Sequence, residues 1–159
     1  MIYNPDWRNN TIEYITTEIP RQLAIKATSS SSAMGWQYFF GEKISGRSNE
    51  LTSFTKIIIR ARSPQEIKMK LSLITNDADA FSTEIQLSKN WQDIEIPLSN
   101  LQADSFLLLP RPYPGFLPLY FKSAGNRPFD ITKVEKLEIS FGGKDQSPTS
   151  IEVESVYFN

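Results

Sequence analysis

The chain has 159 residues, of which 40% are hydrophobic and 12% are aromatic, and its formal net charge is -1. This length and composition suit one sizeable core, so we expect a single domain over residues 1–159. The charged residues are spread along the sequence without a basic stripe, which argues against nucleic acid or an anionic membrane as a partner. No segment approaches the roughly 20 apolar residues of a membrane span. The absence of cysteine and histidine excludes disulfides, thiolate metal sites and histidine-based catalysis.

Nine short segments have the composition and the period of two that are typical of half-buried strands. In chain order they are residues 11–17, 21–27, 34–44, 55–63, 66–74, 81–87, 93–98, 136–141 and 151–158. Such closely spaced short strands predict an all-β, antiparallel jelly-roll β-sandwich of about nine strands. Pro97 removes a backbone donor, so the strand that contains it should end there, at a sheet edge.

The last predicted strand changes phase in its middle. Ile151 and Val153 share one face, whereas Val156 and Phe158 share the opposite one. A β-bulge near Glu154 would turn all four side chains inward.

Residues 102–127 interrupt the strand pattern with the segment LLLPRPYPGFLPLYFK. The segment is too rich in proline for a helix or for an interior strand. Loops of this length are uncommon in compact domains and usually carry a function. We therefore expect one long proline-rich loop that covers or binds something.

Three stretches carry a resemblance to a known family. They are residues 50–62, which begin ELTSF and end in an apolar strand; residues 91–101, WQDIEIPLSNL; and residues 129–141 together with 151–158. In these stretches the chain resembles the galactose-binding-like β-sandwich carbohydrate-binding modules that are appended to bacterial glycoside hydrolases. The matching residues belong to core and turn positions, so the resemblance implies the fold more than the ligand.

The resemblance also implies partners and an ion. Such modules often hold a structural calcium between acidic residues of the first and last strands, where this chain offers Glu13 and Glu154. Calcium requires six to eight oxygen ligands, so these two residues would be only part of a site. The resemblance further implies a monomeric module, secreted or at the cell surface or in the periplasm, within a larger chain that contains a glycoside hydrolase domain.

Sugars are bound by aromatic rings that stack on the pyranose, with polar side chains around them. Trp36, Tyr38 and Phe40 share one face of a predicted strand, where they form either a binding platform or part of the core. In the proline-rich loop, Tyr113, Phe116 and Tyr120 either present their rings beside Arg111 or bury them. Trp91 suits packing better than binding, because it lies in a core motif.

Arg60 and Arg62 occupy the outward phase of their strand, as Lys68 and Lys70 do on the next. Placed side by side, these cations would bond either sugar hydroxyls or a uronate. The alternative is a solvated face with no ligand.

The sequence gives little support for catalysis. Asp77 with Asp79, or Glu152 with Glu154, are carboxylates two residues apart and lack any sign of a shared cleft. We therefore expect no enzyme. Two functions remain open: a non-catalytic module that tethers a polysaccharide-degrading enzyme to its glycan, or a structural sandwich that packs against a catalytic domain through the proline-rich loop.

Overall fold

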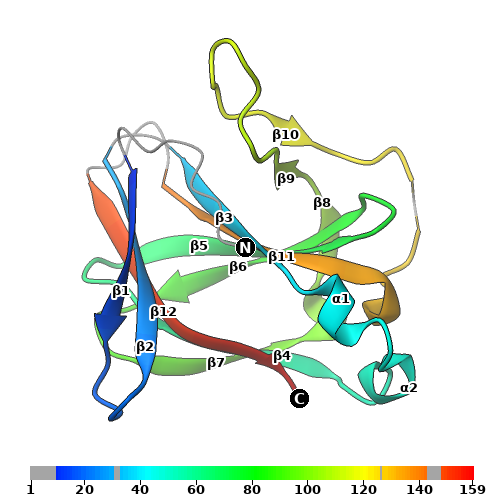
Figure 1. Ribbon diagram of the computed structural model, residues 1–159, viewed down its shortest axis with the longest axis horizontal. Coiled ribbons are helices and arrows are strands. Elements are labelled where there is room, and N and C mark those ends of the chain that lie inside the picture. Colours follow the sequence, from blue (N-terminus) through cyan, green and yellow to red (C-terminus); the bar gives the residue numbers. More distant parts are fainter. Residues whose placement is uncertain (1–9, 31–32, 126, 143–147) are drawn as a thin grey trace.

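The computed structural model describes residues 10–30, 33–125, 127–142 and 148–159 as two five-stranded sheets packed face to face (Figure 1). The first sheet has the order β1 (Asn10–Thr16), β2 (Leu23–Ser29), β12 (Thr149–Phe158), β4 (Lys56–Arg62) and β7 (Gln92–Pro97). The second has the order β3 (Met34–Phe39), β11 (Val134–Phe141), β5 (Ile67–Thr75), β6 (Ala80–Leu87) and β8 (Gln102–Asp104). The strands that pair are antiparallel throughout.

Smaller elements complete the structure. A two-stranded ribbon joins β9 (Phe106–Leu107) to β10 (Tyr120–Phe121). Two one-turn helices, α1 (Gly41–Ile44) and α2 (Ser48–Leu51), follow β3, and two 3-10 turns, η1 (Leu98–Asn100) and η2 (Ile131–Lys133), precede β8 and β11.

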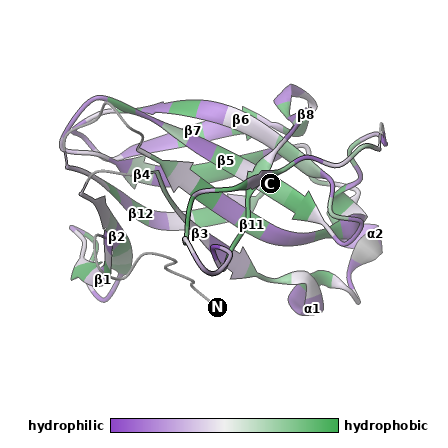
Figure 2. Cartoon of the chain, turned by 90° about the horizontal axis from the view of Figure 1, so that it is seen from above, coloured by the Kyte–Doolittle hydropathy of each residue, from purple (hydrophilic) through white to green (hydrophobic). Residues whose placement is uncertain are grey.

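One continuous core fills the space between the sheets. Alternating residues such as Ile57 and Ile59 on β4 and Leu71 and Leu73 on β5 point inward and are almost completely buried. Figure 2 shows the matching alternation of hydrophobic and hydrophilic residues along the strands. Burial of this apolar surface is the main stabilising contribution to the fold.

The all-β sandwich is confirmed, and the nine predicted strands all occur. The additional strands, β8, β9 and β10, are only two or three residues long and lie in residues 102–127. The predicted strand over residues 34–44 was too long, because it ends at Phe39 and continues into α1. Gly41 packs so closely on the neighbouring strand that an added Cβ would lie 3.1 Å from the Cγ of Glu135.

Two finer predictions are also confirmed. β7 ends at Pro97 and is one of the two edge strands of the first sheet. A register shift at Glu154 lets Val153 pair with Ala61 and Ser155 with Arg60, so that both halves of β12 face the core.

This bulge also opens the sheet on its other side. β12 pairs with β2 only over the segment from Thr149 to Val153. Beyond the bulge β12 pairs with β4 but no longer with β2, so β2 and the C-terminal half of β12 separate. The separation leaves a cleft between the sheets.

Candidate binding site

An arm of residues 108–119 connects β9 to β10 and projects from one end of the sandwich (Figure 1). Most of the large hydrophobic side chains that the described residues expose lie on this arm and on β10; they are Tyr113, Phe116, Leu117, Leu119, Tyr120 and Phe121. A cluster of this kind on a surface is typical of a binding region.

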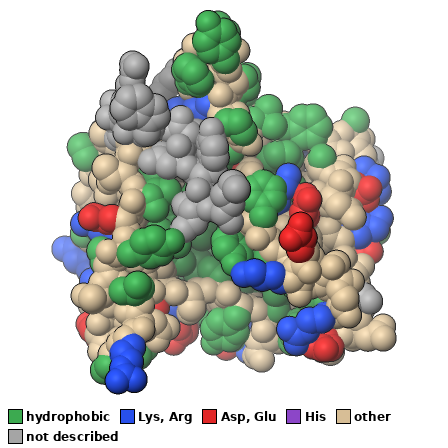
Figure 3. All heavy atoms as spheres, viewed as in Figure 1, with side chains coloured by type: hydrophobic (Ala, Val, Ile, Leu, Met, Phe, Trp, Pro, Cys, Tyr) green, Lys and Arg blue, Asp and Glu red, His purple; other side chains and the backbone are tan. Residues whose placement is uncertain are grey.

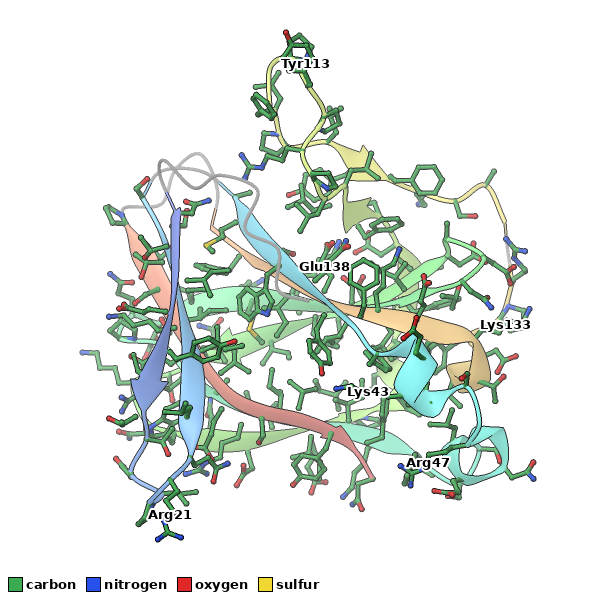
Figure 4. All side chains as sticks on the ribbon, viewed as in Figure 1. Arg21, Lys43, Arg47, Tyr113, Lys133 and Glu138 are labelled. Carbon is green, nitrogen blue, oxygen red and sulfur yellow. The ribbon has the colours of Figure 1, made fainter. Side chains whose placement is uncertain are left out.

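The tip of the arm holds two aromatic rings in a fixed arrangement. The Phe116 N–H donates to the Pro112 carbonyl at 3.0 Å, and the Leu108 N–H donates to the Leu119 carbonyl at 2.8 Å. The rings of Tyr113 and Phe116 meet edge to face, with centroids 5.9 Å apart. Tyr113 is 83% exposed and lies at the outermost end of the arm in Figure 4. The arm therefore presents its rings.

The base of the arm is bonded to the outer face of the second sheet. The Leu107 N–H donates to Glu138 Oε1 at 2.8 Å, and its carbonyl accepts from Gln37 Nε2 at 3.3 Å. The same Gln37 amide donates to Glu138 Oε2 at 2.6 Å. Phe106 packs on Ile74 and against the ring of Phe121. The ribbon thus forms a third layer on this sheet.

Glu138, on β11, is labelled in Figure 4. Its side chain is completely buried beneath this third layer. Burial raises the pKa of Glu138 to about 7, against the opposing hydrogen bonds from Gln37 and Leu107. A carboxyl group that titrates near neutral pH therefore lies at the point where the arm is attached.

Arg111 belongs to the arm and bonds it to the segment that precedes β3. Its side chain is buried, and its guanidinium donates to the Ala33 carbonyl ahead of β3. The sequence led us to expect this cation beside the rings as a binding group. The structure turns it toward the backbone instead, where it can position the arm.

A polar groove of ≈ 610 Å³ lies next to the arm, over β5, β6 and β8. Its lining consists of Lys70, Ser82, Thr83, Glu84, Asn100, Gln102, Ala103 and Asp104. Lys70 links the groove to the base of the arm, because its ammonium lies 6.0 Å from the centroid of the ring of Tyr120, which is on β10. Amide, hydroxyl and carboxylate groups of this kind can hydrogen-bond to sugar hydroxyls.

The charges of the groove neutralise one another. Lys70 Nζ lies 2.6 Å from Asp104 Oδ2, and Lys68 Nζ lies 3.0 Å from Glu84 Oε2. Burial alone would raise the pKa of Asp104, but hydrogen bonds from Lys70 and from the Ser105 N–H hold that pKa below its usual range. The groove offers hydrogen bonds without a net charge.

Trp36 and Tyr38 lie on the inner side of β3, far from this face. Trp36 is buried, and its ring meets Phe141 edge to face at 6.5 Å. Tyr38 is half-buried and stacks on Phe40 at 6.4 Å. The exposed ring of this strand is Phe39, on the outer side.

Arg60 and Arg62 lie on the outer face of the first sheet. The expectation that they adjoin Lys68 and Lys70 was wrong, because those lysines belong to the second sheet. The phase of alternation gives the outward side of a strand but does not assign the strand to a sheet. Arg62 pairs with Glu152 at 2.5 Å.

Arg60, the second of these two arginines, also forms ion pairs with carboxylates. Arg60 pairs with Asp93 at 3.2 Å and with Glu154 at 3.3 Å. The ring of Trp91 lies under both guanidinium groups, 5.8 Å from that of Arg60 and 4.7 Å from that of Arg62. On this face, both arginines are paired with carboxylates and pack on the half-buried ring of Trp91.

The acidic residues considered for calcium are also paired with cations. Glu13 lies 3.4 Å from Lys26 Nζ, and the register aligns it with Glu152 rather than with Glu154. Among the described residues, no group of three or more acidic, histidine or cysteine side chains is arranged to hold a metal ion. Glu13 and Glu154 do not by themselves fit calcium, and the ion stays a prediction.

The carboxylate pairs considered for catalysis are engaged in a similar way. Asp79 bonds to Arg127 at 2.7 Å, and Asp77 bonds to Lys133 at 3.0 Å. Glu152 and Glu154 pair with Arg62 and Arg60 as described above.

In the described part of the chain, no helix is long and apolar enough to cross a membrane.

Sequence reasoning identified the rings of the arm but not the groove beside it. Of the residues that line the groove, Lys70 was predicted to face outward, and the phase of alternation on its strand was the signal that could have located the groove. Gln102 and Asp104 belong to β8, which has three residues and therefore no detectable period. The bond from Leu107 to Glu138 joins residues 31 positions apart and left no sequence signal.

No protein-family model matches the sequence, and no curated protein matches it. Solved structures do. The family 11 carbohydrate-binding module from Clostridium thermocellum, in complex with a β-1,3-1,4-mixed-linked tetrasaccharide, has a TM-score of 0.67 at 11% identity, over 99% of this chain and 86% of that one.

Two other structures are similar over the same span. The family 30 carbohydrate-binding module of a C. thermocellum cellulosomal cellulase has a TM-score of 0.55 at 10% identity, over 99% of this chain and 90% of that one. An exo-β-agarase has a TM-score of 0.62 at 11% identity, over 99% of this chain but only 23% of the agarase. The predicted resemblance is thus confirmed for the fold: the chain has the β-sandwich of these carbohydrate-binding modules.

Proposed function

We propose that this chain is a non-catalytic carbohydrate-binding module whose ligand is an uncharged polysaccharide or oligosaccharide. The observation that carries the proposal is the exposed aromatic surface of the arm beside a polar groove. Tyr113, Phe116 and Tyr120 stack on pyranose rings, and the groove supplies hydrogen bonds to hydroxyl groups. Polysaccharides are long enough to contact both surfaces.

The charge balance of the groove supports an uncharged ligand. Lys70 and Lys68 are each bonded to a carboxylate, so neither offers a free cation to a uronate or a sulfate. Arg60 and Arg62 on the first sheet are also paired with carboxylates, so they too offer no free cation to an acidic glycan. Pectin and other acidic glycans are therefore poor ligands.

The structural neighbours support the class of ligand and the setting. One was solved with a mixed-linked tetrasaccharide, and one is an exo-β-agarase of which this fold forms a minor part. In this proposal the module is a monomeric part of a larger bacterial protein, secreted or at the cell surface or in the periplasm. It holds a glycoside hydrolase domain close to its substrate and so raises the effective concentration of the enzyme.

Affinity electrophoresis and calorimetry test the proposal with mixed-linkage β-glucan, agarose, xylan and mannan, and with pectin as the acidic comparison. We expect one uncharged class to bind, and Tyr113→Ala or Tyr120→Ala to weaken binding by about tenfold, the scale of one lost aromatic contact. Tyr157→Ala is the matched control. Tyr157 is 50% exposed on a different sheet, so its loss should leave glycan affinity unchanged. Trp36→Ala is unsuitable, because that residue is in the core.

Absence of binding to every glycan at millimolar module concentration contradicts the proposal. The exposed apolar arm would then favour the structural alternative, in which it packs against a catalytic domain of the parent chain. Hydrogen exchange separates the two functions: protection of residues 108–121 in the parent protein without glycan indicates an intramolecular interface.

A further inference from the structure

A cleft of ≈ 500 Å³ opens between the sheets, on the side where β2 separates from β12. It is distinct from the arm and from the polar groove, whose lining residues it does not share. Figure 3 shows hydrophobic side chains on both sides of this hollow. Its size lies within the range of small-molecule sites.

The cleft is apolar almost throughout. One wall is the β1–β2 hairpin, the opposite wall is β3 with α1, and the floor is the inter-sheet core; representative residues are Tyr14, Leu23, Ile25, Trp36, Phe40 and Ile139. Tyr14 and Leu23 are 66% and 55% exposed, so the mouth is itself apolar. Such walls suit a hydrocarbon chain better than a polyhydroxylated sugar.

One cation stands at this apolar cleft. Lys43 extends from α1 on the cleft side, as Figure 4 shows, and its Nζ donates to the Tyr38 hydroxyl at 2.5 Å. Among the described residues, no carboxylate forms an ion pair with Lys43. Glu154 also lines the cleft, but its carboxylate is bonded to Arg60 and its side chain is only 2% exposed. Because Lys43 is bonded to a hydroxyl group and not to a carboxylate, it can bind an anion without breaking an ion pair.

We propose that this cleft binds an amphipathic carboxylate of the fatty-acid class. The hydrocarbon chain lies between the hairpin and β3, over the core floor, and the carboxylate bonds to Lys43 and to the Tyr38 hydroxyl. The site is independent of the proposed glycan site. Either one can therefore fail without the other.

Titration calorimetry with decanoate, below its micelle concentration, tests the site against decanol, which has the same chain length and no charge. We expect one saturable decanoate site per chain. Lys43→Met should weaken decanoate binding by about fivefold, the upper range for a partly exposed ion pair, and leave decanol unchanged. Lys136→Met is the matched control, because Lys136 also lies over a ring, 4.9 Å from that of Phe39, on the outer face of β11.

A second variant tests the location. Leu23→Trp places a larger side chain at the exposed mouth, where the fold can tolerate it, and should abolish binding of both ligands. Thermal unfolding of each variant checks that the fold is intact. The inference is overturned if decanoate shows no saturable binding, if Lys43→Met binds both ligands as the unchanged chain does, or if Leu23→Trp retains decanoate binding.

Discussion

The outer faces of the two sheets satisfy their polar and charged side chains in different ways. On the first sheet, charged side chains pair across neighbouring strands, as in Lys26 with Glu13, Arg62 with Glu152 and Lys56 with Glu95. On the second sheet, Gln37 and Glu138 are buried beneath the β9–β10 ribbon and bond to its backbone.

This difference indicates which face is specialised. Partly exposed ion pairs contribute little free energy each. Buried hydrogen bonds are more costly to break, because the donor or acceptor that remains is then buried without a partner and without water. The second sheet uses such bonds to hold an arm whose rings are exposed. The face that carries the arm is therefore the one on which we place the glycan.

The largest expected effect comes from removing the bond that attaches the arm. Glu138→Ala leaves the Leu107 N–H and one N–H of the Gln37 amide without an acceptor in a buried site, because the other Gln37 bond, to the Leu107 carbonyl, is kept. This change should lower the free energy of unfolding by about 3 kcal/mol. Glu152→Ala breaks an ion pair on the first sheet and should cost about 1 kcal/mol or less.

Urea unfolding at about pH 5.5 measures both variants, at a pH where Glu138 is largely protonated in the folded state. Equal losses would mean that the network under the ribbon does not hold the arm more firmly than surface ion pairs hold the first sheet. Circular dichroism before unfolding checks that both variants retain the sandwich.

The pH dependence of stability should be the next largest effect. The pKa of Glu138 is raised from 4.5 to about 7 on folding, so the folded state binds its proton more tightly than the unfolded state does. The stabilisation from this group is thus present below about pH 4.5 and is lost as the pH rises through 7. Across this interval the loss should be roughly 2.5 kcal/mol.

Glu138→Gln isolates this contribution, because glutamine keeps the shape of the protonated side chain and does not titrate. The difference in unfolding free energy between the variant and the unchanged chain should grow in favour of the variant from about pH 5 to about pH 8. Asp104 and Asp130, whose pKa values are lowered, act at lower pH and cancel in this difference. A constant difference across the interval would contradict the titration of Glu138.

The sequence predicted the sandwich because its strands are half-buried, and half-burial leaves a period of two. The bulge at Glu154 could be predicted for the same reason, since it is a local departure from that period. The end of β7 could be predicted because Pro97 has no backbone N–H to donate to a neighbouring strand. The rings of the arm were identified from composition alone. Their exposure, with Tyr113 at 83%, required the structure.

The features of the candidate site that could not be predicted depend on contacts between segments that are distant in the sequence. Glu138 has the outward phase and reads as a solvated residue, yet the β9–β10 ribbon buries it. Arg60 and Lys70 also share the outward phase, but they lie on different sheets. Alternation identifies the buried side of one strand and carries no information about which strands meet or what covers the other side.

The smallest expected effect concerns the exposed ion pairs of the first sheet. Lys56 Nζ lies 2.9 Å from Glu95 Oε2, and the Glu95 side chain is 59% exposed. Glu95→Gln should lower the free energy of unfolding by about 0.5 kcal/mol or less in dilute buffer. In about 1 M salt, where charges are screened beyond about 3 Å, the difference should disappear. The loss caused by Glu138→Ala should persist in the same salt, because it arises from unsatisfied hydrogen bonds in a buried site. A salt-sensitive Glu138→Ala loss beside a salt-insensitive Glu95→Gln loss would reverse the contrast between the two faces.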